Sequence, residues 1–118
     1  MEDMSRNAIK TVPPTIAKAT KLERMILKNN NLKKLPPKIG SVGRQLELLD
    51  VSNNALKKLP KSIYTLRGVV DCTNNQIESL PNVVSTKKSK PTVECLILRG
   101  NKIVELPERW SSIYQIRV

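Results

Sequence analysis

The chain has 118 residues, which suits one domain, and its 21 Lys and Arg against 10 Asp and Glu give a formal net charge of +11. No apolar run approaches the roughly 18 residues that a transmembrane helix needs, and no signal-peptide pattern opens the chain. The sequence has no His, which excludes Ser-His-Asp and Cys-His catalysis, and its four Gly form no phosphate-binding loop. We therefore expect a non-enzymatic protein without a cofactor or metal.

One sequence phrase recurs along the chain, and a fixed-period repeat decides the fold. In chain order, its copies span 4–13, 22–36, 46–60, a shorter copy that ends at 81, and 93–107. Their asparagines are spaced by 23, 24, 21 and 26 residues, and their prolines keep the same steps. The shared pattern is LxxLxLxxNxLxxLPxxI. Its L-x-L step has a period of two, which predicts a short strand in each copy.

This pattern resembles the leucine-rich repeat family, in the subclass with a unit of roughly 23 residues that carries LPxxI. The resemblance covers essentially the whole chain. It implies an α/β solenoid with about five parallel strands on the concave face, and loops and short helical turns on the convex face. We expect residues 1–118 to form a single domain of about five repeats. Because neither end carries the polar cap that terminal repeats need, we also expect it to be part of a longer chain or an assembly.

The period of two separates the side chains of each predicted strand into an inward and an outward set. The inward set should stack into a continuous core: Met4, Met25, Leu27, Leu49, Val51, Cys72, Leu96 and Leu98. By resemblance, the outward set forms the usual recognition surface on the concave face: Asp3, Ser5, Ile26, Lys28, Asp50, Ser52, Asp71, Thr73, Ile97 and Arg99. Ile26 and Ile97 are candidate apolar anchors. Asp50 and Asp71 should lie about 5 Å apart on neighbouring strands, which favours a partner's Lys or Arg over acid–base catalysis.

Each copy places an asparagine where the chain turns sharply away from its strand. An Asn side chain offers two donors and one acceptor, so it can satisfy backbone groups that would otherwise be buried and unpaired. We predict a structural asparagine ladder of Asn7, Asn30, Asn54, Asn75 and Asn101.

The copies are not uniform. The copy before Asn75 is two residues short, and we expect a strained or bulged strand around 69–72. A helical or 3₁₀ turn is expected over 16–20, and a more irregular segment around Gly40 and Gly43. Residues 85–91 form a basic insertion, read as an exposed loop. Trp110, Ile113 and Ile116 lead into a sixth strand that should remain incomplete and frayed.

The two cysteines, Cys72 and Cys95, are expected to be reduced thiols, because their predicted directions do not favour a bridge and no cysteine-rich cap is present. We therefore expect an intracellular protein, cytoplasmic or, alternatively, in an organelle.

The positive charge gathers away from the predicted strands. Lysines follow the asparagine of three successive copies and should form a row on one flank, with a second cluster on the 85–91 insertion. This basic flank comprises Lys10, Lys33, Lys34, Lys57, Lys58, Lys87, Lys88 and Lys90. Two interpretations remain open: a solvated surface, and a docking surface for an anionic partner.

Two functions follow from these surfaces. The first is a protein–protein interaction module, a scaffold or adaptor, that binds a protein partner on the concave face. The alternative is a basic structural subunit of a large ribonucleoprotein, ribosome-associated or organellar ribosomal, whose lysine flank contacts RNA phosphates.

Overall fold

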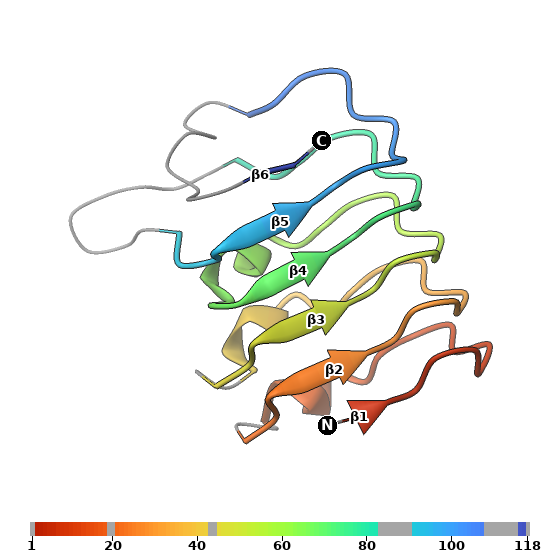
Figure 1. Cartoon of the computed structure of the whole chain (residues 1–118), viewed down its shortest axis with the longest axis vertical. Helices are drawn as coiled ribbons and strands as arrows, with labels where there is room; N and C mark the ends of the chain where they lie inside the picture. The colour runs from red at the N-terminus through yellow and green to blue at the C-terminus, as the bar shows by residue number, and fades with distance from the viewer. Residues whose placement is uncertain (1, 19–20, 43–44, 83–90, 108–115, 118) are drawn as a thin grey trace.

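The computed structural model describes residues 2–18, 21–42, 45–82, 91–107 and 116–117, which form a solenoid built on one parallel sheet. Six strands pair in chain order, so each repeat adds one strand beside the previous one (Figure 1). The strands are β1 (Glu2–Asp3), β2 (Arg24–Ile26), β3 (Leu48–Asp50), β4 (Val69–Asp71), β5 (Cys95–Ile97) and β6 (Ile116–Arg117). The α/β solenoid expected from the sequence is confirmed, with six strands where about five were predicted.

The sixth strand forms because its backbone continues the ladder of β5. Ile116 lies opposite Leu96, and the Leu98 amide donates to the Arg117 carbonyl over 2.6 Å. At the opposite edge β1 has only two residues, with Glu2 opposite Met25, where the other repeats carry a core residue. The fraying was predicted for residues 110–118, of which 110–115 and 118 lie outside the described residues, as does the 85–90 part of the basic insertion.

The inward side chains of successive strands stack into one core. Met25, Leu27, Leu49, Val51, Cys72 and Leu96 are almost wholly buried, as the period of two predicts. Val70 joins them and settles the register of the fourth repeat, while Met4 at the amino-terminal end is only partly buried.

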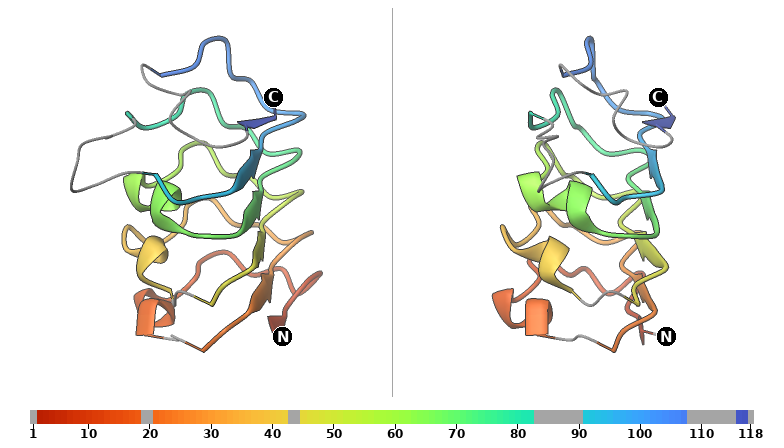
Figure 2. Two further views of the ribbon diagram at one scale, coloured as in Figure 1. Left: turned by 60° about the vertical axis from the view of Figure 1, so that its left-hand side comes forward. Right: turned by 90° about the vertical axis from the view of Figure 1, so that its left-hand side faces the viewer.

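The convex side carries three short 3₁₀ helices, which lie across the core from the sheet (Figure 2). They are η1 (Pro14–Lys18), η2 (Ile39–Ser41) and η3 (Lys61–Thr65). The LPxxI pattern explains them: the carbonyls of Pro13, Pro36 and Pro60 accept hydrogen bonds of 3.0 Å from the amides of Ile16, Ile39 and Ile63. This i to i+3 bond is the 3₁₀ bond. It turns the isoleucine inward, and Ile39 and Ile63 are fully buried.

The fourth repeat absorbs its shorter length on the convex side, not in the strand. The expected bulge is wrong, because Val69, Val70 and Asp71 pair one to one with β3 and with β5. Only Leu66, Arg67 and Gly68 connect η3 to β4. Gly68 makes this short path possible, since a Cβ there would overlap the Glu47 carbonyl oxygen.

Candidate functional site

The outer surface of the sheet, which is the concave face, carries a central row of side chains in strict register. Strand pairing places Asp3 beside Ile26, Ile26 beside Asp50, and Asp50 beside Asp71. Ile97 and Arg117 complete the row. Ile26, Asp50, Asp71 and Ile97 are each half-buried and Asp3 is exposed. The structure thus brings the predicted acidic pair together between the two predicted isoleucine anchors.

A second row lies two residues further along each strand: Ser5, Lys28, Ser52, Thr73 and Arg99. Backbone hydrogen bonds that follow the strands keep it in register. The Asn29 amide donates to the Ser52 carbonyl over 3.1 Å, and the Asn53 amide to the Thr73 carbonyl over 2.8 Å. Ser52 and Thr73 therefore lie in the middle of this row, with the exposed cations Lys28 and Arg99 on either side.

The two rows are linked within repeats by an Asp-x-Ser/Thr motif. The Ser52 amide and hydroxyl both donate to Asp50 Oδ1, over 3.0 and 2.6 Å. Thr73 binds Asp71 Oδ1 over the same two distances, and Ser5 binds Asp3 Oδ1 over 3.0 and 2.7 Å. Each bond pair fixes its carboxylate and occupies one oxygen. The other two repeats replace the motif by Ile26-x-Lys28 and Ile97-x-Arg99.

Charges and hydrogen bonds on the concave face shift the pKa values of groups on that face and in the core. Hydrogen bonds from the Ser5 backbone and side chain lower the pKa of Asp3, and the charge of Lys28 contributes less. Burial raises the pKa of the Cys72 thiol, and the negative charges of Asp71 and Asp50 add to that rise. Cys72 is therefore a neutral core side chain. Cys95 is also buried, and neither cysteine is bonded to the other.

A third row was missed by the sequence analysis. Arg24, Leu48, Val69 and Cys95 lie side by side at the starts of β2 to β5, two residues before the central row. Leu48 and Val69 are half-buried, so apolar surface adjoins the acidic pair. The alternation that predicted Asp50 and Asp71 to face outward also predicts this row, because its residues lie two positions earlier in each strand.

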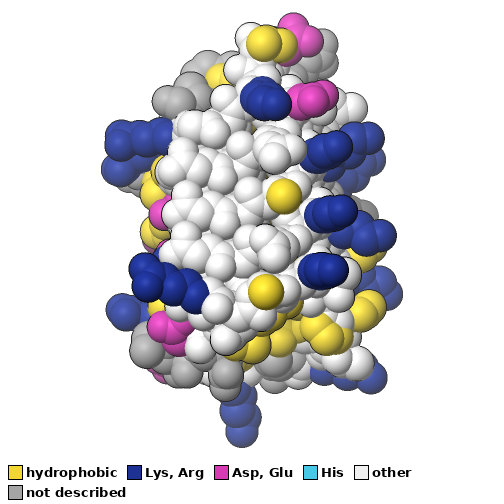
Figure 3. Space-filling model, turned by 90° about the vertical axis from the view of Figure 1, so that its right-hand side faces the viewer, with side chains coloured by type: hydrophobic (Ala, Val, Ile, Leu, Met, Phe, Trp, Pro, Cys, Tyr) yellow, Lys and Arg dark blue, Asp and Glu magenta, His cyan; other side chains and the backbone are white. Residues whose placement is uncertain are grey.

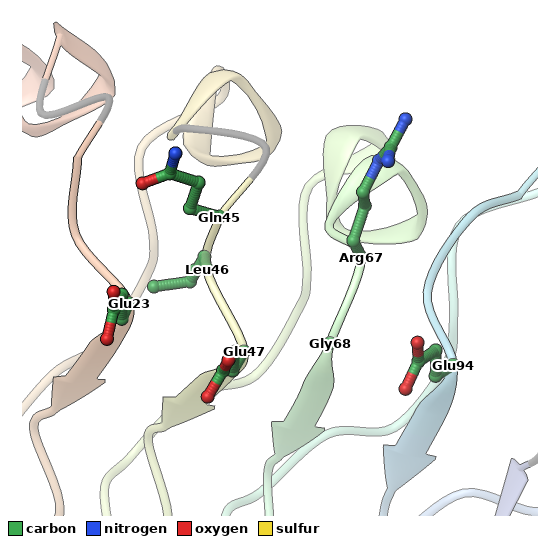
Figure 4. Close-up of a pocket in the computed structure, with 7 residues that line it drawn as sticks. All are labelled: Glu23, Gln45, Leu46, Glu47, Arg67, Gly68 and Glu94. Atoms are coloured by element: carbon green, nitrogen blue, oxygen red, sulfur yellow. The ribbon is translucent and has the colours of Figure 1, made fainter.

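An open hollow lies at the strand starts. It is lined by Glu23, Gln45, Leu46, Glu47, Arg67, Gly68 and Glu94. In Figure 4 the three glutamates extend in the same direction from the starts of β2, β3 and β5, whereas Arg67 points away from them. The hollow exists because Gly68 leaves no side chain between Glu47 and Glu94. All three glutamates are exposed.

The asparagine ladder ties each repeat to the one before it. Asn54 Oδ1 accepts a 3.0 Å bond from the Leu32 amide, and Asn54 Nδ2 donates to the carbonyls of Leu27 and Val51 over 3.0 and 2.9 Å. Asn30, Asn75 and Asn101 bind the equivalent groups of their own and the preceding repeat. Asn7 differs: it has no preceding repeat among the described residues, and its exposed side chain bonds to none of them.

A second polar row, also missed, precedes the ladder. The residue before each ladder asparagine has a left-handed backbone: Arg6, Asn29, Asn53, Asn74 and Gly100, with φ between 55° and 72°. Asn and Gly adopt this conformation at least cost, which explains the doubled asparagines at 29–30, 53–54 and 74–75. Asn74 Nδ2 also donates to Asn53 Oδ1 over 3.0 Å.

The lysines of the basic flank emerge in matching positions. Figure 3 looks onto the turns that follow the strands, and Lys and Arg side chains line both long edges of that face. Equivalent backbone bonds link the turns after the ladder asparagines. The amides of Asn31, Ala55 and Glu78 donate to the carbonyls of Ile9, Leu32 and Lys57, which sets Lys10, Lys33, Lys57 and Glu78 in one row. Lys10, Lys33, Lys34, Lys57 and Lys58 are all exposed. Lys87, Lys88 and Lys90 lie outside the described residues.

Within the described residues, no group of acidic, Cys or His side chains is arranged to hold a metal ion. That part of the chain also contains no helix with the length and apolar character required to cross a bilayer.

This chain resembles known proteins both in a repeat of its sequence and in its fold. Residues 45–66 match the family model described as Leucine Rich Repeat. The fold is similar to a solved LRR protein of Leptospira interrogans, with a TM-score of 0.63 and 30% identity over 80% of this chain. The match covers 24% of that protein, so the chain spans about a quarter of its length. No curated protein matches the chain in sequence.

Proposed function

Because the chain belongs to the leucine-rich repeat family, we propose that it is a non-enzymatic protein-interaction module, a scaffold or adaptor, that binds its partner on the concave face. One observation carries this proposal. Asp50 and Asp71 are held rigidly side by side on a chain of net charge +11, and neither forms an ion pair with any described residue. A structural acid would be expected to pair with one of the many available cations; an unpaired, oriented acid is suited to a partner's cation.

The test compares two sets of substitutions in the same capture experiment. Proteins retained from a native extract by the unaltered chain should be lost with Asp50→Lys/Asp71→Lys. They should be retained when Lys33, Lys34, Lys57 and Lys58 are all changed to Gln. Retention after the aspartate reversal would contradict the concave site.

A second function, a basic subunit of a ribonucleoprotein, is supported by the exposed lysines of the flank, which have no ion pair among the described residues. If the flank binds RNA phosphates, the affinity should fall linearly with salt on a log–log plot. The four-lysine variant should flatten the slope by roughly three units, at about 0.7–0.9 per contact. Loss of partners in that variant, with retention in the aspartate variant, would favour this second function over the first.

A further inference from the structure

The acidic pair lies inside an apolar frame on three sides. Ile26 and Ile97 flank Asp50 and Asp71 across the strands. Leu48 and Val69 adjoin them at the strand starts. The fourth side is formed by Ser52 and Thr73, which hold the carboxylates. A partner that covers this frame would exclude water from the carboxylates, and charge pairs strengthen as the local dielectric falls.

Each aspartate keeps one oxygen for a partner. Ser52 and Thr73 donate only to the Oδ1 atoms, and no described residue bonds to either Oδ2. The carboxylates are therefore pre-oriented, with one open acceptor each. Neighbouring strands are about 4.8 Å apart, so a partner must supply two cations at nearly this spacing, or one cation shared by both acids.

The backbone hydrogen bonding of the sheet limits which kind of partner segment can bind across its strands. Strands β2 to β5 pair with one another along their lengths, so the concave face offers side chains and no unpaired backbone edge. An extended segment that crosses the strands would find no backbone partners for its own amides and carbonyls. An α-helix satisfies those groups internally and needs only side-chain contacts.

The spacing of the row also matches a helix. At about 4.8 Å per strand, Ile26, Asp50, Asp71 and Ile97 lie at about 0, 5, 10 and 14 Å along the row. Residues i, i+3, i+7 and i+10 of one helix face lie at about 0, 4.5, 10.5 and 15 Å along its axis. An extended chain repeats each face about every 6.7 Å, so it would place one side chain, not two, between the isoleucines.

We propose that the concave face binds an amphipathic α-helix of a protein partner, with Lys or Arg at i+3 and i+7 between apolar residues at i and i+10. The basic residues contact Asp50 and Asp71, and the apolar residues contact Ile26 and Ile97. Lys28 and Arg99 repel a basic helix that is displaced toward the strand ends, so they restrict its position. This inference rests on the proposed function and specifies the class of partner.

The experiment uses three defined peptides and fluorescence anisotropy at two salt concentrations. The first is a side-chain-crosslinked helix of about 18 residues with Leu at i and i+10 and Arg at i+3 and i+7, long enough for stable helicity. The second moves both Arg residues to the opposite helix face. The third is a Pro-flanked extended peptide with the sequence Leu-x-Arg-x-Leu. The unaltered protein should bind the first peptide at least about tenfold more tightly than the other two, as expected for charge-assisted hydrogen bonds.

Two variants with the same change in net charge provide the control. Asp50→Asn/Asp71→Asn should weaken binding of the first peptide about tenfold or more. Glu78→Gln/Glu105→Gln removes two exposed carboxylates outside the concave face and should leave its affinity within about twofold. Circular dichroism melts confirm that each variant is folded before its affinity is compared.

Equal binding of the first two peptides, or equal losses in the two variants, would overturn the proposal. Tighter binding of the extended peptide would overturn it in favour of one shared cation. None of these results would overturn the proposed function, which fails only if native partners are still captured after Asp50→Lys/Asp71→Lys.

Discussion

The asparagine ladder and the acidic pair are both rows of polar side chains repeated in register, yet they use their hydrogen-bonding groups differently. Asn30 and Asn75 are buried, and the ladder amides bind backbone groups of two successive repeats. Asp50 and Asp71 are half-buried, and each is bonded through one oxygen only. The buried asparagines thus use their amide groups within the protein, whereas each aspartate keeps an acceptor oxygen that no described residue uses.

The largest expected change in the free energy of unfolding distinguishes two members of the ladder, Asn54 and Asn7. Asn54→Leu removes the partner of the Leu32 amide and of the Leu27 and Val51 carbonyls. We expect the free energy of unfolding to fall by about 3 kcal/mol in denaturant melts, the upper part of the range for unsatisfied buried groups.

Asn7→Leu is the matched control, because the Asn7 side chain is exposed and binds no described residue. Its effect should stay within about 0.5 kcal/mol. Similar losses in the two variants would mean that the ladder does not act through bonds to the preceding repeat.

The second largest change in the free energy of unfolding is expected among the residues with a left-handed backbone that precede the ladder asparagines. Asn53 has φ of 55°, a conformation that a β-branched residue adopts only with strain. Asn53→Val should lower the free energy of unfolding by about 1–2 kcal/mol. Asn53→Gly should stay within about 0.5 kcal/mol, because Gly adopts positive φ freely. A Val variant as stable as the Gly variant would show that the turn can relax without this conformation.

The acidic pair should affect stability less than either asparagine row. Asp50→Asn/Asp71→Asn keeps an acceptor oxygen for Ser52 and Thr73 and removes a repulsion of about 0.8 kcal/mol at 5 Å in water. The free energy of unfolding should change by less than about 1 kcal/mol, although the same variant should weaken binding of the basic helical peptide about tenfold or more. A large loss of stability would make these acids part of the scaffold and weaken their assignment to recognition.

The smallest effect is expected on the basic flank. Changing Lys33, Lys34, Lys57 and Lys58 to Gln removes four exposed charges that have no ion pair among the described residues. Thermal melts at low and high salt should agree with the unaltered protein within about 0.5 kcal/mol. A larger, salt-dependent stabilisation would show that these lysines repel one another strongly.

Several structural features were accessible from local pattern. The alternation in Leu49-Asp50-Val51 predicted which side chains are buried. The resemblance implied short helical turns on the convex side, but the turn expected over 16–20 begins at Pro14, and Gly40, expected in an irregular segment, lies within η2. The fourth strand was mispredicted as bulged because sequence spacing shows that residues are missing but not where the chain absorbs the loss. Gly68, whose missing Cβ permits close approach to Glu47, identifies that place only once the neighbouring repeat is in position.

The repeat, the inward set and the position of each ladder asparagine could be predicted from the amino-acid pattern alone, because these depend on periodicities within one unit. The matching repeat positions also predicted neighbours across the strands. They placed Asp50 beside Asp71, but the apolar neighbours of this pair at the strand starts, Leu48 and Val69, became evident only from the strand pairing. The repeats differ in length, with asparagine steps from 21 to 26 residues, so lateral register depends on how each convex segment accommodates the difference. Strand pairing then aligns Ile26, Asp50, Asp71 and Ile97, and this alignment creates the framed acidic pair.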